Sequence, residues 1–364
     1  MHWSPQQELA IQEVSRWYKA GADPVFYLAG YAGTGKTTIA RHLVSETGAK
    51  ACYGAFTGKA ASVMRSSGCE DAATLHSLIY KFKQGTNGKF IKKVNKGQSS
   101  RIVQSDIIVV DECSMVDGEL GRDLEGFGKP ILVLGDPAQL PPVKGGGHFT
   151  AREPDQMLTE IHRQAEGNPI IRMATDVRQG KGIDFCRLGE SAVVSKADFK
   201  AGYDVTSFDQ LLCGLNKSRM DFNIRLRQIK GITSELPMEG DRLVCLKNDR
   251  DLQIFNGGMF TALSVWPDDG GNTIQMTVRA DDDDKIVSVE VRKEIMLGTH
   301  KPHWAELKET QEFTYGYALT VHKAQGSQWN DVVLFDEAFG SAEDRQRWLY
   351  TGITRAANRI VIVR

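Results

Sequence analysis

The sequence lacks the features that mark membrane, secreted and metal-stabilised proteins. No apolar run reaches the roughly 18 to 20 residues of a membrane helix, and the start MHWSPQQELA has no signal-peptide layout. The 6 cysteines are scattered, with no C-x-x-C pair and no histidines at zinc-ligand spacing, so neither a disulfide framework nor a structural zinc is expected. These absences predict an intracellular, cytoplasmic protein with no membrane partner.

An excess of either charge is also lacking. The 45 Lys and Arg residues nearly balance the 46 Asp and Glu residues, which excludes a binder that holds nucleic acid by bulk positive charge alone. A local basic surface is still expected, because residues 72–105 contain seven Lys or Arg residues and no acidic residue. The length of 364 residues and the 41% hydrophobic content predict two domains or one elaborated α/β unit.

The order of apolar segments is typical of an α/β protein with mostly parallel sheets. A helix is expected over residues 4–18, with Ser4 as N-cap and Pro5 at its first position. Between 240 and 311, short alternating runs separated by glycine-rich turns predict a small inserted β-barrel or sheet. Other strands are expected at 25–29, 50–56, 107–110, 131–134, 210–215 and 359–363, and other helices at 169–179 and 217–228.

Residues 30–37 form the complete pattern G-x-x-x-x-G-K-T between a predicted strand and a predicted helix. Glycines at this spacing let backbone N–H groups converge on phosphates, while Lys36 neutralises the β and γ oxygens and Thr37 ligates Mg²⁺. The alternative is a glycine-rich turn without a ligand. The predicted nucleotide-binding residues of this segment are Gly30, Gly33, Thr34, Gly35, Lys36, Thr37 and Thr38.

Polar residues follow two further predicted strands. Asp111 and Glu112 end the strand at 107–110, where the first can hold Mg²⁺ and the second can polarise an attacking water. Gln139 lies in the turn after the strand at 131–134, where its amide could read the γ-phosphate. Taken alone, the acidic pair could be a solvated strand end and the turn a proline-rich surface turn. With the glycine-rich loop they indicate a nucleoside triphosphatase.

Together these segments resemble the superfamily 1 DNA helicases of the RecD-like and Dda-like branch, in a compact phage-type form, and the resemblance extends over nearly the whole chain. It is carried by residues 30–37, 55–61, 74–78, 111–115, 135–142, 158–164, 320–328 and 349–356. The resemblance implies two RecA-like P-loop motor domains, with a small β-hairpin insertion in the first and a small SH3-like β insertion in the second. The implied boundaries are 1–163 for the first domain, with its hairpin at about 80–105, 164–239 and 312–364 for the second, and 240–311 for the insertion.

The resemblance also implies further residues of the nucleotide site. ATP would lie between the two motor domains, with Arg163 and Arg355 as arginine fingers and Gly326 close to the nucleotide. Gln7 matches the glutamine that recognises adenine in the family, and Gln6 is an adjacent alternative. The implied cofactors are ATP and Mg²⁺.

Single-stranded DNA would lie across both domains in a protein of this kind. The implied contacts are Thr57, Lys59, Thr74, His76, Thr320, His322 and Lys323. Helix capping by the threonines and ordinary core or surface positions for the histidines are the alternatives. Arg219, Arg225 and Arg227 could line the same groove or form a solvated helix face. Phe56 stands where the family has proline, and Gln328 where it has glutamate.

The basic segment at 80–101 contains turn-forming residues and apolar points, which predicts a β-hairpin. A hairpin at this place splits the duplex in the resembled family. Phe90 is expected to stack on the base pair at the fork, while Lys92 and Lys93 hold neighbouring phosphates. The alternative is a solvated lysine loop.

The implied function is that of an ATP-dependent DNA helicase that moves 5′-to-3′ on single-stranded DNA and unwinds duplex DNA by coupling hydrolysis to closure of two motor domains. A role in DNA replication, repair or recombination follows, with a DNA fork as substrate, a monomer as a sufficient form, and a single-strand-binding protein or replisome component as a candidate partner. One alternative is an ATP-dependent translocase that remodels protein–DNA complexes or RNA. The other is a recombination subunit that uses ATP as a conformational switch.

Overall fold

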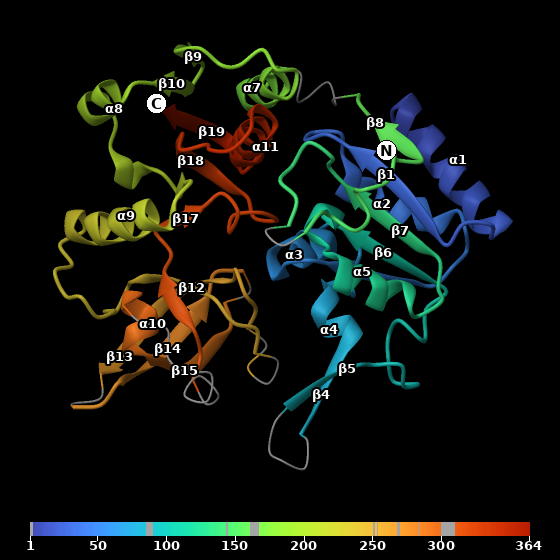
Figure 1. Cartoon of the computed structure of the whole chain (residues 1–364), viewed down its shortest axis with the longest axis horizontal. Coiled ribbons are helices and arrows are strands. Elements are labelled where there is room, and N and C mark those ends of the chain that lie inside the picture. Colours follow the sequence, from blue (N-terminus) through green and yellow to red (C-terminus); the bar gives the residue numbers. More distant parts are fainter. Residues whose placement is uncertain are drawn as a thin grey trace. The chain divides into compact units, whose positions relative to one another are not determined.

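A computed structural model of the chain describes residues 3–84, 90–142, 145–160, 167–249, 252, 254–267, 270–282, 284–299 and 310–364. These residues form two compact units (Figure 1). The first unit comprises Met1–Ile183 and Ser341–Thr354, and the second comprises Asp184–Gly340 and Arg355–Arg364. Within the described ranges, none of the helices combines the length and the apolar character that crossing a membrane requires.

A six-stranded parallel sheet forms the centre of the first unit, in the order β3-β2-β6-β7-β1-β8. Its strands are β1 (Val25–Gly30), β2 (Ala51–Ala55), β3 (Ala73–Thr74), β6 (Ile107–Asp111), β7 (Ile131–Gly135) and β8 (Gln156–Leu158). Every residue of β1, β6 and β7 is buried, as expected for parallel strands that are covered on both faces. These are the strands that carry the predicted nucleotide-site residues at their carboxyl ends.

Helices cover both faces of this sheet, because successive strand residues point to opposite sides. Phe26 and Leu28 of β1 belong to a core with α1, α2 and α3, whereas Val25 and Tyr27 belong to a core with α4 and α5. The helices of the unit are α1 (Pro5–Ala20), α2 (Lys36–Ser45), α3 (Gly58–Ser66), α4 (Leu75–Ile79), α5 (Gly118–Glu125), α7 (Pro169–Arg178), α11 (Ala342–Ile353) and the short 3₁₀ helix η1 (Cys113–Met115). The unit is therefore a three-layer α/β structure.

The N-terminal helix begins where the sequence predicts. Ser4 has extended backbone angles, its side chain accepts a hydrogen bond from the Gln7 N–H, and Pro5 occupies the first turn. The Gln7 side chain accepts in return from the Ser4 N–H, which completes a capping box. The helix ends at Gly21, whose φ of 61° is left-handed.

The basic segment forms an antiparallel pair of strands, β4 (Tyr80–Gln84) and β5 (Phe90–Val94), that extends from α4 away from the sheet (Figure 1). Tyr80 pairs with Val94 at the base of this hairpin. The Tyr80 hydroxyl donates a hydrogen bond of 2.5 Å to Asp123 Oδ2 of α5. The base of the hairpin is thus fastened to the first unit by a buried aromatic side chain.

The second unit contains another six-stranded sheet, in the order β17-β11-β18-β19-β10-β9. Its strands are β9 (Cys186–Leu188), β10 (Ser191–Val194), β11 (Gln210–Cys213), β17 (Ala318–Thr320), β18 (Trp329–Phe335) and β19 (Ala356–Val363). The β9–β10 pair is antiparallel and the other pairs are parallel. Without the edge strands β8 and β9, both sheets have the strand order third, second, fourth, fifth, first along the chain. The two sheets therefore share one topology.

The chain between β11 and β17 forms a separate five-stranded antiparallel sheet, in the order β15-β14-β13-β12-β16. Its strands are β12 (Arg242–Cys245), β13 (Met259–Pro267), β14 (Thr273–Ala280), β15 (Ile286–Arg292) and β16 (Phe313–Tyr315). Buried and exposed residues alternate along β14 and β15, which explains why the pattern was visible in the sequence. The remaining helices of the unit are α8 (Lys196–Gly202), η2 (Val205–Ser207), α9 (Asn216–Ile229) and α10 (Lys293–Leu297).

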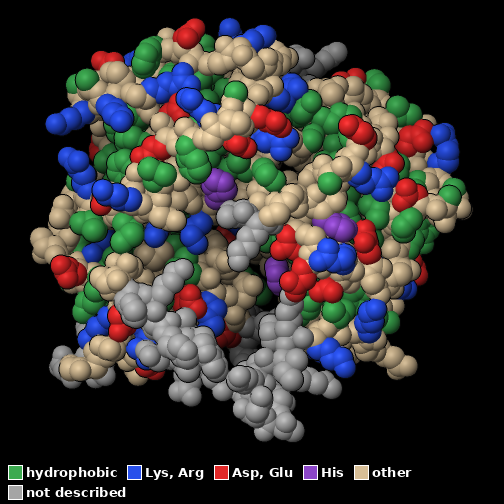
Figure 2. Space-filling view, viewed as in Figure 1, with side chains coloured by type: hydrophobic (Ala, Val, Ile, Leu, Met, Phe, Trp, Pro, Cys, Tyr) green, Lys and Arg blue, Asp and Glu red, His purple; other side chains and the backbone are tan. Residues whose placement is uncertain are grey.

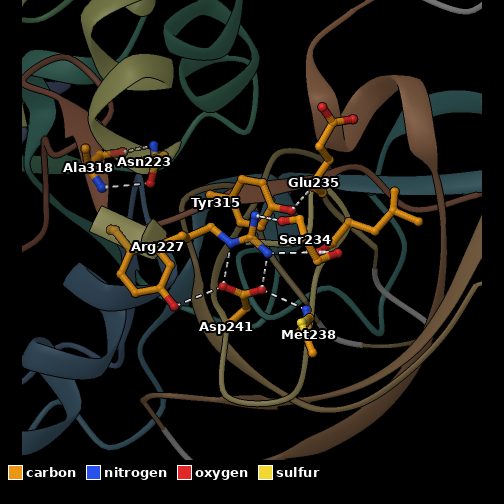
Figure 3. Close-up of polar contacts among 10 residues, drawn as sticks. Asn223, Arg227, Ser234, Glu235, Met238, Asp241, Tyr315 and Ala318 are labelled. Carbon is orange, nitrogen blue, oxygen red and sulfur yellow. Dashed lines mark hydrogen bonds and ion pairs between the residues drawn. The ribbon is translucent and has the colours of Figure 1, made fainter. Parts of the chain in front are cut away.

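A buried ion pair ties α9 to the chain that enters this five-stranded sheet (Figure 3). Arg227 donates from Nε to Asp241 Oδ1 and from Nη2 to Asp241 Oδ2, both at 2.9 Å, and from Nη1 to the Ser234 carbonyl. The Tyr317 hydroxyl donates to the same carboxylate at 3.0 Å. The prediction that Arg227 lines a DNA groove or a solvated helix face is wrong, because this side chain is buried and its donors are used inside the protein.

Candidate active site

The glycine-rich loop connects β1 to α2 in a backbone conformation that needs its glycines. Gly33 and Gly35 have φ values of 81° and 76°, in the left-handed region that favours glycine. A Cβ atom on Gly30 would lie 2.7 Å from Thr34 Oγ1 and 3.2 Å from Lys36 Cδ. The loop therefore packs too closely for a side chain at Gly30, and Gly33 and Gly35 adopt angles that other residues rarely take, as expected of a phosphate-binding loop.

The structure brings the predicted lysine, threonine and aspartate of the nucleotide site together. Lys36 Nζ donates to the carbonyl oxygens of Gly30 and Tyr31, at 2.5 and 3.0 Å. Thr37 Oγ1 donates to Asp111 Oδ2 at 2.7 Å, which joins the start of α2 to the end of β6. Lys36 thus lies against the loop that would hold the phosphates.

Asp111 is a buried carboxylate with few opposing charges. Burial raises the pKa of Asp111 above its ordinary value, while hydrogen bonds from Thr37 and from the Glu112 N–H and the nearby Lys36 charge act in the opposite direction. A carboxylate and a hydroxyl oxygen are hard ligands of the kind that Mg²⁺ prefers. The pair fits a Mg²⁺ ion, whose charge would favour the ionised form of the buried acid.

Glu112 follows Asp111 in an uncommon backbone conformation. Its φ of 54° and ψ of 44° are left-handed, and only one other described residue besides glycine, Asp284, has a positive φ. The Glu112 N–H donates to Asp111 Oδ1 at 2.8 Å. The strand thus ends in a sharp turn at the second of the two acidic residues.

Two adjacent residues of α11 hold the turn that follows β7. The Tyr350 hydroxyl donates to Asp136 Oδ2 at 2.6 Å and accepts from the Ala32 N–H of the glycine-rich loop at 2.9 Å. Thr351 Oγ1 accepts from the Leu140 N–H at 2.9 Å. Both side chains lie within the segment 349–356, but the sequence assigned neither of them a role, because nothing local indicates which distant backbone they meet.

Gln139 lies inside this turn and is buried. Its Oε1 atom has no hydrogen-bond partner among the described residues. A buried amide oxygen without a partner is uncommon in proteins and indicates a group reserved for water or a ligand. The side-chain carbonyl oxygen of the predicted phosphate-reading residue is therefore buried without a hydrogen-bond partner within the described part of the chain.

The two N-terminal glutamines differ in their surroundings. Gln7 is buried, and its Nε2 donates to the Thr34 carbonyl of the glycine-rich loop at 3.1 Å. Gln6 Oε1 accepts from the backbone N–H groups of Thr159 and Glu160, at 2.7 and 3.0 Å. Gln7 is the one that touches the loop. Thr38 is exposed in the first turn of α2.

Four of the residues predicted to contact DNA gather at the carboxyl ends of β2 and β3. Thr57 caps α3 by accepting from the Ala60 N–H at 3.1 Å, and Lys59 follows in the first turn. Thr74 precedes α4, whose residue His76 contacts the rings of Phe56 and Tyr80 at centroid distances of 5.7 and 5.9 Å. The strands bring them together, since Ala55 pairs with Thr74.

The second unit contains three further predicted DNA contacts. Thr320 is buried at the end of β17, and its Oγ1 accepts from the Lys323 N–H at 3.3 Å. Burial lowers the pKa of His322, so this imidazole is neutral near pH 7. Burial and the neighbouring Arg219 lower the pKa of Lys323. These groups follow the same edge of their sheet that carries Thr57 and Thr74 in the first unit.

Of the two predicted arginine fingers, Arg163 and Arg355, the structure describes only Arg355. Arg355 is buried, and its Nη1 donates to the Ser327 carbonyl at 3.1 Å, one residue after Gly326 with its φ of 71°. Arg163 lies outside the described residues. The same holds for the side chains of Phe90 and Lys92, whereas Lys93 is exposed in β5.

Basic and acidic side chains are interspersed over the face of the molecule in Figure 2, as the near-zero net charge predicts.

A carboxylate of the protein itself accepts hydrogen bonds at the start of one helix in the second unit. Glu337 Oε2 accepts from the N–H groups of Gly214 and Leu215, at 2.9 and 3.1 Å, and Oε1 accepts from the Ser218 hydroxyl at 2.6 Å. No signal in the sequence pointed to this contact, because Glu337 lies 123 positions from Gly214.

Comparison with known proteins agrees with this geometry. Residues 2–198 match the family described as AAA domain, and residues 315–363 match the UvrD-like helicase C-terminal domain. The ATP-dependent RecD2 DNA helicase of Deinococcus radiodurans is 28% identical, over 91% of this chain and 46% of that protein. The conjugal transfer protein TraA of Rhizobium radiobacter is 27% identical, over 89% of this chain and 29% of that protein. The chain thus spans about half or less of these relatives.

A solved Pif1 helicase structure has the same fold. The structure described for DNA unwinding at forked double-stranded DNA by two Pif1 helicases has a TM-score of 0.62 and 19% identity, and covers 100% of this chain and 92% of that one. Both units, with their shared strand order, are included in this match. The chain therefore belongs to the AAA-domain family, and the proteins it resembles include RecD2 and Pif1 helicases.

Proposed function

We propose that this chain is an ATP-dependent DNA helicase that moves 5′-to-3′ along single-stranded DNA and unwinds duplex DNA. The observation that carries the proposal is the assembly of Lys36, Thr37, Asp111 and Glu112 where β1 and β6 end. A lysine on a glycine-rich loop, a hydroxyl–carboxylate pair and a second carboxylate are the parts that ATP hydrolysis needs. A binding module that used ATP only as a switch would not need Glu112.

In the proposed hydrolysis step, Lys36 leaves the carbonyls of Gly30 and Tyr31 and binds the β and γ phosphate oxygens. Thr37 and Asp111 would hold Mg²⁺, which when bound neutralises charge on the phosphates. Glu112 polarises the attacking water and Gln139 reads the γ-phosphate. Arg163 and Arg355 act as arginine fingers, and Gln7 recognises adenine.

Nucleic acid would bind along the carboxyl ends of the strands. Thr57, Lys59, Thr74 and His76 offer hydroxyl, ammonium and imidazole groups to the phosphates and sugars of single-stranded DNA. Thr320, His322 and Lys323 extend this set in the second unit. The relatives support DNA as the substrate, because one is named a DNA helicase and a solved Pif1 structure is described as bound to single-stranded DNA.

The hairpin β4–β5 is proposed as the element that splits the duplex, through Phe90, Lys92 and Lys93. Its attachment through Tyr80 to α5 supports this role, because a splitting element must resist force. Separation of a base-pair step costs about 1.4 kcal/mol of stacking, which the hydrolysis of one ATP per step would supply.

The domain organisation belongs to the same proposal. Residues 1–163 form a first RecA-like motor domain and residues 164–239 with 312–364 a second one, with 240–311 as an SH3-like insertion. The shared strand order of the two sheets supports this division, and α11 connects β18 to β19 of the second sheet along the chain. A monomer then contains every motor element, and a single-strand-binding protein or replisome component is the proposed partner at a fork.

The deciding experiment combines an ATPase assay with an unwinding assay. We expect single-stranded DNA to stimulate ATP hydrolysis, and a duplex with a 5′ single-stranded tail to be unwound while its 3′-tailed counterpart is not. Unwinding from the 3′ tail alone would reverse the polarity. Stimulated hydrolysis without unwinding of either duplex would favour a translocase, and an RNA substrate run in parallel tests remodelling of RNA.

A further inference from the structure

Helix α11 joins the glycine-rich loop to the turn that carries Gln139. The Tyr350 hydroxyl accepts a hydrogen bond from the Ala32 N–H at 2.9 Å and donates one to Asp136 Oδ2 at 2.6 Å. Asp136 begins the turn, and its Oδ1 accepts from the Ala138 N–H at 3.0 Å. A single side chain therefore bridges the loop and the first residue of the turn.

The next residue of α11 holds the other end of the same turn, since Thr351 Oγ1 accepts from the Leu140 N–H at 2.9 Å. The exposed fractions of Tyr350, Thr351 and Asp136 are 1%, 0% and 1%. Water does not compete for hydrogen bonds at this depth, so each bond holds its groups more firmly than a bond on the surface. The turn is thus fixed at both ends by neighbouring side chains of one helix.

The hydroxyl bridge has a fixed direction. Burial and the adjacent Asp136 carboxylate keep the pKa of Tyr350 well above its ordinary value, so the phenol retains its proton. That proton points to the carboxylate, which is the stronger acceptor, and the phenol oxygen is left to accept from the Ala32 N–H. The loop and the turn are therefore linked through one defined arrangement.

The helix that packs beside α11 braces the neighbouring loop residue. The guanidinium carbon of Arg178, at the end of α7, lies 3.5 Å from the centroid of the Tyr31 ring. Gln346 of α11 donates to the Arg178 carbonyl, which connects the two helices. Two consecutive residues of the glycine-rich loop, Tyr31 and Ala32, are thus held by side chains of α7 and α11.

We infer that Tyr350 is a positioning residue for nucleotide hydrolysis, whose hydroxyl fixes the glycine-rich loop relative to the turn Asp136–Leu140 and so places the Gln139 amide. The inference rests on the proposed function, because it needs a nucleotide that is hydrolysed on the loop. The unpartnered Gln139 Oε1 supports it, since the turn holds a buried polar atom without a hydrogen-bond partner among the described residues. Tyr350 itself acts through Asp136 and Ala32.

The test is the variant Tyr350→Phe, which keeps the ring and removes the hydroxyl. We expect kcat for ATP hydrolysis with single-stranded DNA to fall about 10- to 100-fold, with KM for ATP and Kd for ADP within about 3-fold of the wild type. A matched control is Tyr315→Phe, because the Tyr315 hydroxyl is also buried and donates to a carbonyl, that of Glu235, at 2.6 Å. This control should lower the thermal midpoint similarly and leave kcat unchanged.

A double-mutant cycle with Asp136→Asn separates positioning from general damage. If Tyr350 acts through Asp136, the two losses in kcat are strongly non-additive and the double variant resembles the worse single variant. Three results would each overturn this inference while the proposed function stands. They are a wild-type kcat in Tyr350→Phe, additive losses in the cycle, and an equal loss of kcat in Tyr315→Phe. Absence of ATP hydrolysis in the wild-type protein would overturn the proposed function, and this inference with it.

Discussion

The first parallel strand of each sheet leads into a helix, but the two connections differ in chemistry. In the first unit β1 continues through the glycine-rich loop, and α2 begins at Lys36. In the second unit β10 is followed by Ser195 alone, and α8 begins at Lys196. Ser195 Oγ accepts from the Asp198 N–H at 3.1 Å, so this helix start is capped by its own sequence. The same place in the same topology therefore holds a glycine-rich loop in the first unit and a self-capped helix start in the second, and only the former is a candidate anion site.

The second strands of the two sheets show the same contrast. β2 leads to α3, whose cap Thr57 is itself one of the proposed DNA contacts. β11 leads to α9, where Glu337 accepts hydrogen bonds from Gly214, Leu215 and Ser218. A carboxylate of the protein thus occupies a position at a helix start that could otherwise attract a phosphate. At this place the second unit therefore has an internal cap, whereas the first unit has a residue that the proposed function assigns to DNA.

The largest effect is expected from the matched pair Lys36→Ala and Lys196→Ala. The first should abolish ATP hydrolysis, because it removes the positive charge from the phosphate loop, and should leave DNA binding without nucleotide intact. The second changes the corresponding first residue of α8, which is exposed, and should leave ATP hydrolysis unchanged. Steady-state ATPase rates measure both, and equal losses would break the comparison between the two units.

Arg355→Ala tests whether the second unit contributes to catalysis at all. We expect turnover to fall about 1,000-fold with little change in ATP affinity, as for the loss of an arginine finger. Arg355→Lys should restore little, because a point charge does not reproduce the planar grip of guanidinium. Wild-type coupling between ATP hydrolysis and unwinding in Arg355→Lys would show that the residue is not a finger.

Glu112→Gln should lower turnover about 100-fold or more while ATP still binds tightly, because the amide cannot activate water. Rapid-mixing measurements of nucleotide binding, beside steady-state rates, separate the two effects. Asp123→Asn is the matched control, because it makes the same kind of change, from carboxylate to amide, at a residue that bonds Tyr80 at the base of the hairpin. It should leave turnover near the wild-type value. Near-normal turnover in Glu112→Gln would remove Glu112 from its catalytic role.

The smallest expected effect concerns stability. Glu337→Ala removes the acceptor of two backbone N–H groups and one hydroxyl, and should lower the free energy of unfolding by about 1 to 3 kcal/mol. Urea unfolding measures the change, while nucleotide affinity should stay as in the wild type. The control Glu343→Ala alters a side chain that is 71% exposed in its pair with Arg347, and should change stability by less than about 0.5 kcal/mol. Equal changes in the free energy of unfolding of both variants would show that Glu337 does not stabilise the start of α9.

Local patterns predicted the parts of the fold that depend on neighbouring residues. Ser4 and Pro5 fix the start of α1, and the glycine-rich loop lies between the strand and the helix that the sequence indicated. The strand β10 was not predicted, because it has only 4 residues and obtains its place from pairing with β19. A short apolar segment does not show which distant strand it will meet.

The residues that hold the site in place could not be predicted from the sequence, because their partners are distant along the chain. Arg227 looked like a surface residue because its partner Asp241 is 14 positions away and lies beyond the end of α9. Tyr350 is 318 positions from Ala32, and a tyrosine in an apolar helical stretch is usually a core residue. Motifs indicated which segments carry chemistry, whereas the residues that hold those segments in place became visible only in three dimensions.

The left-handed backbone of Glu112 has a consequence for how this protein responds to selection. A side chain in that region costs on the order of 1 kcal/mol relative to glycine, so Glu112→Gly should relieve strain and make the fold more resistant to heat. The same substitution removes the carboxylate proposed to activate water. A library screened for heat resistance alone would therefore enrich inactive variants at this position, and a screen that also requires ATP hydrolysis would retain glutamate.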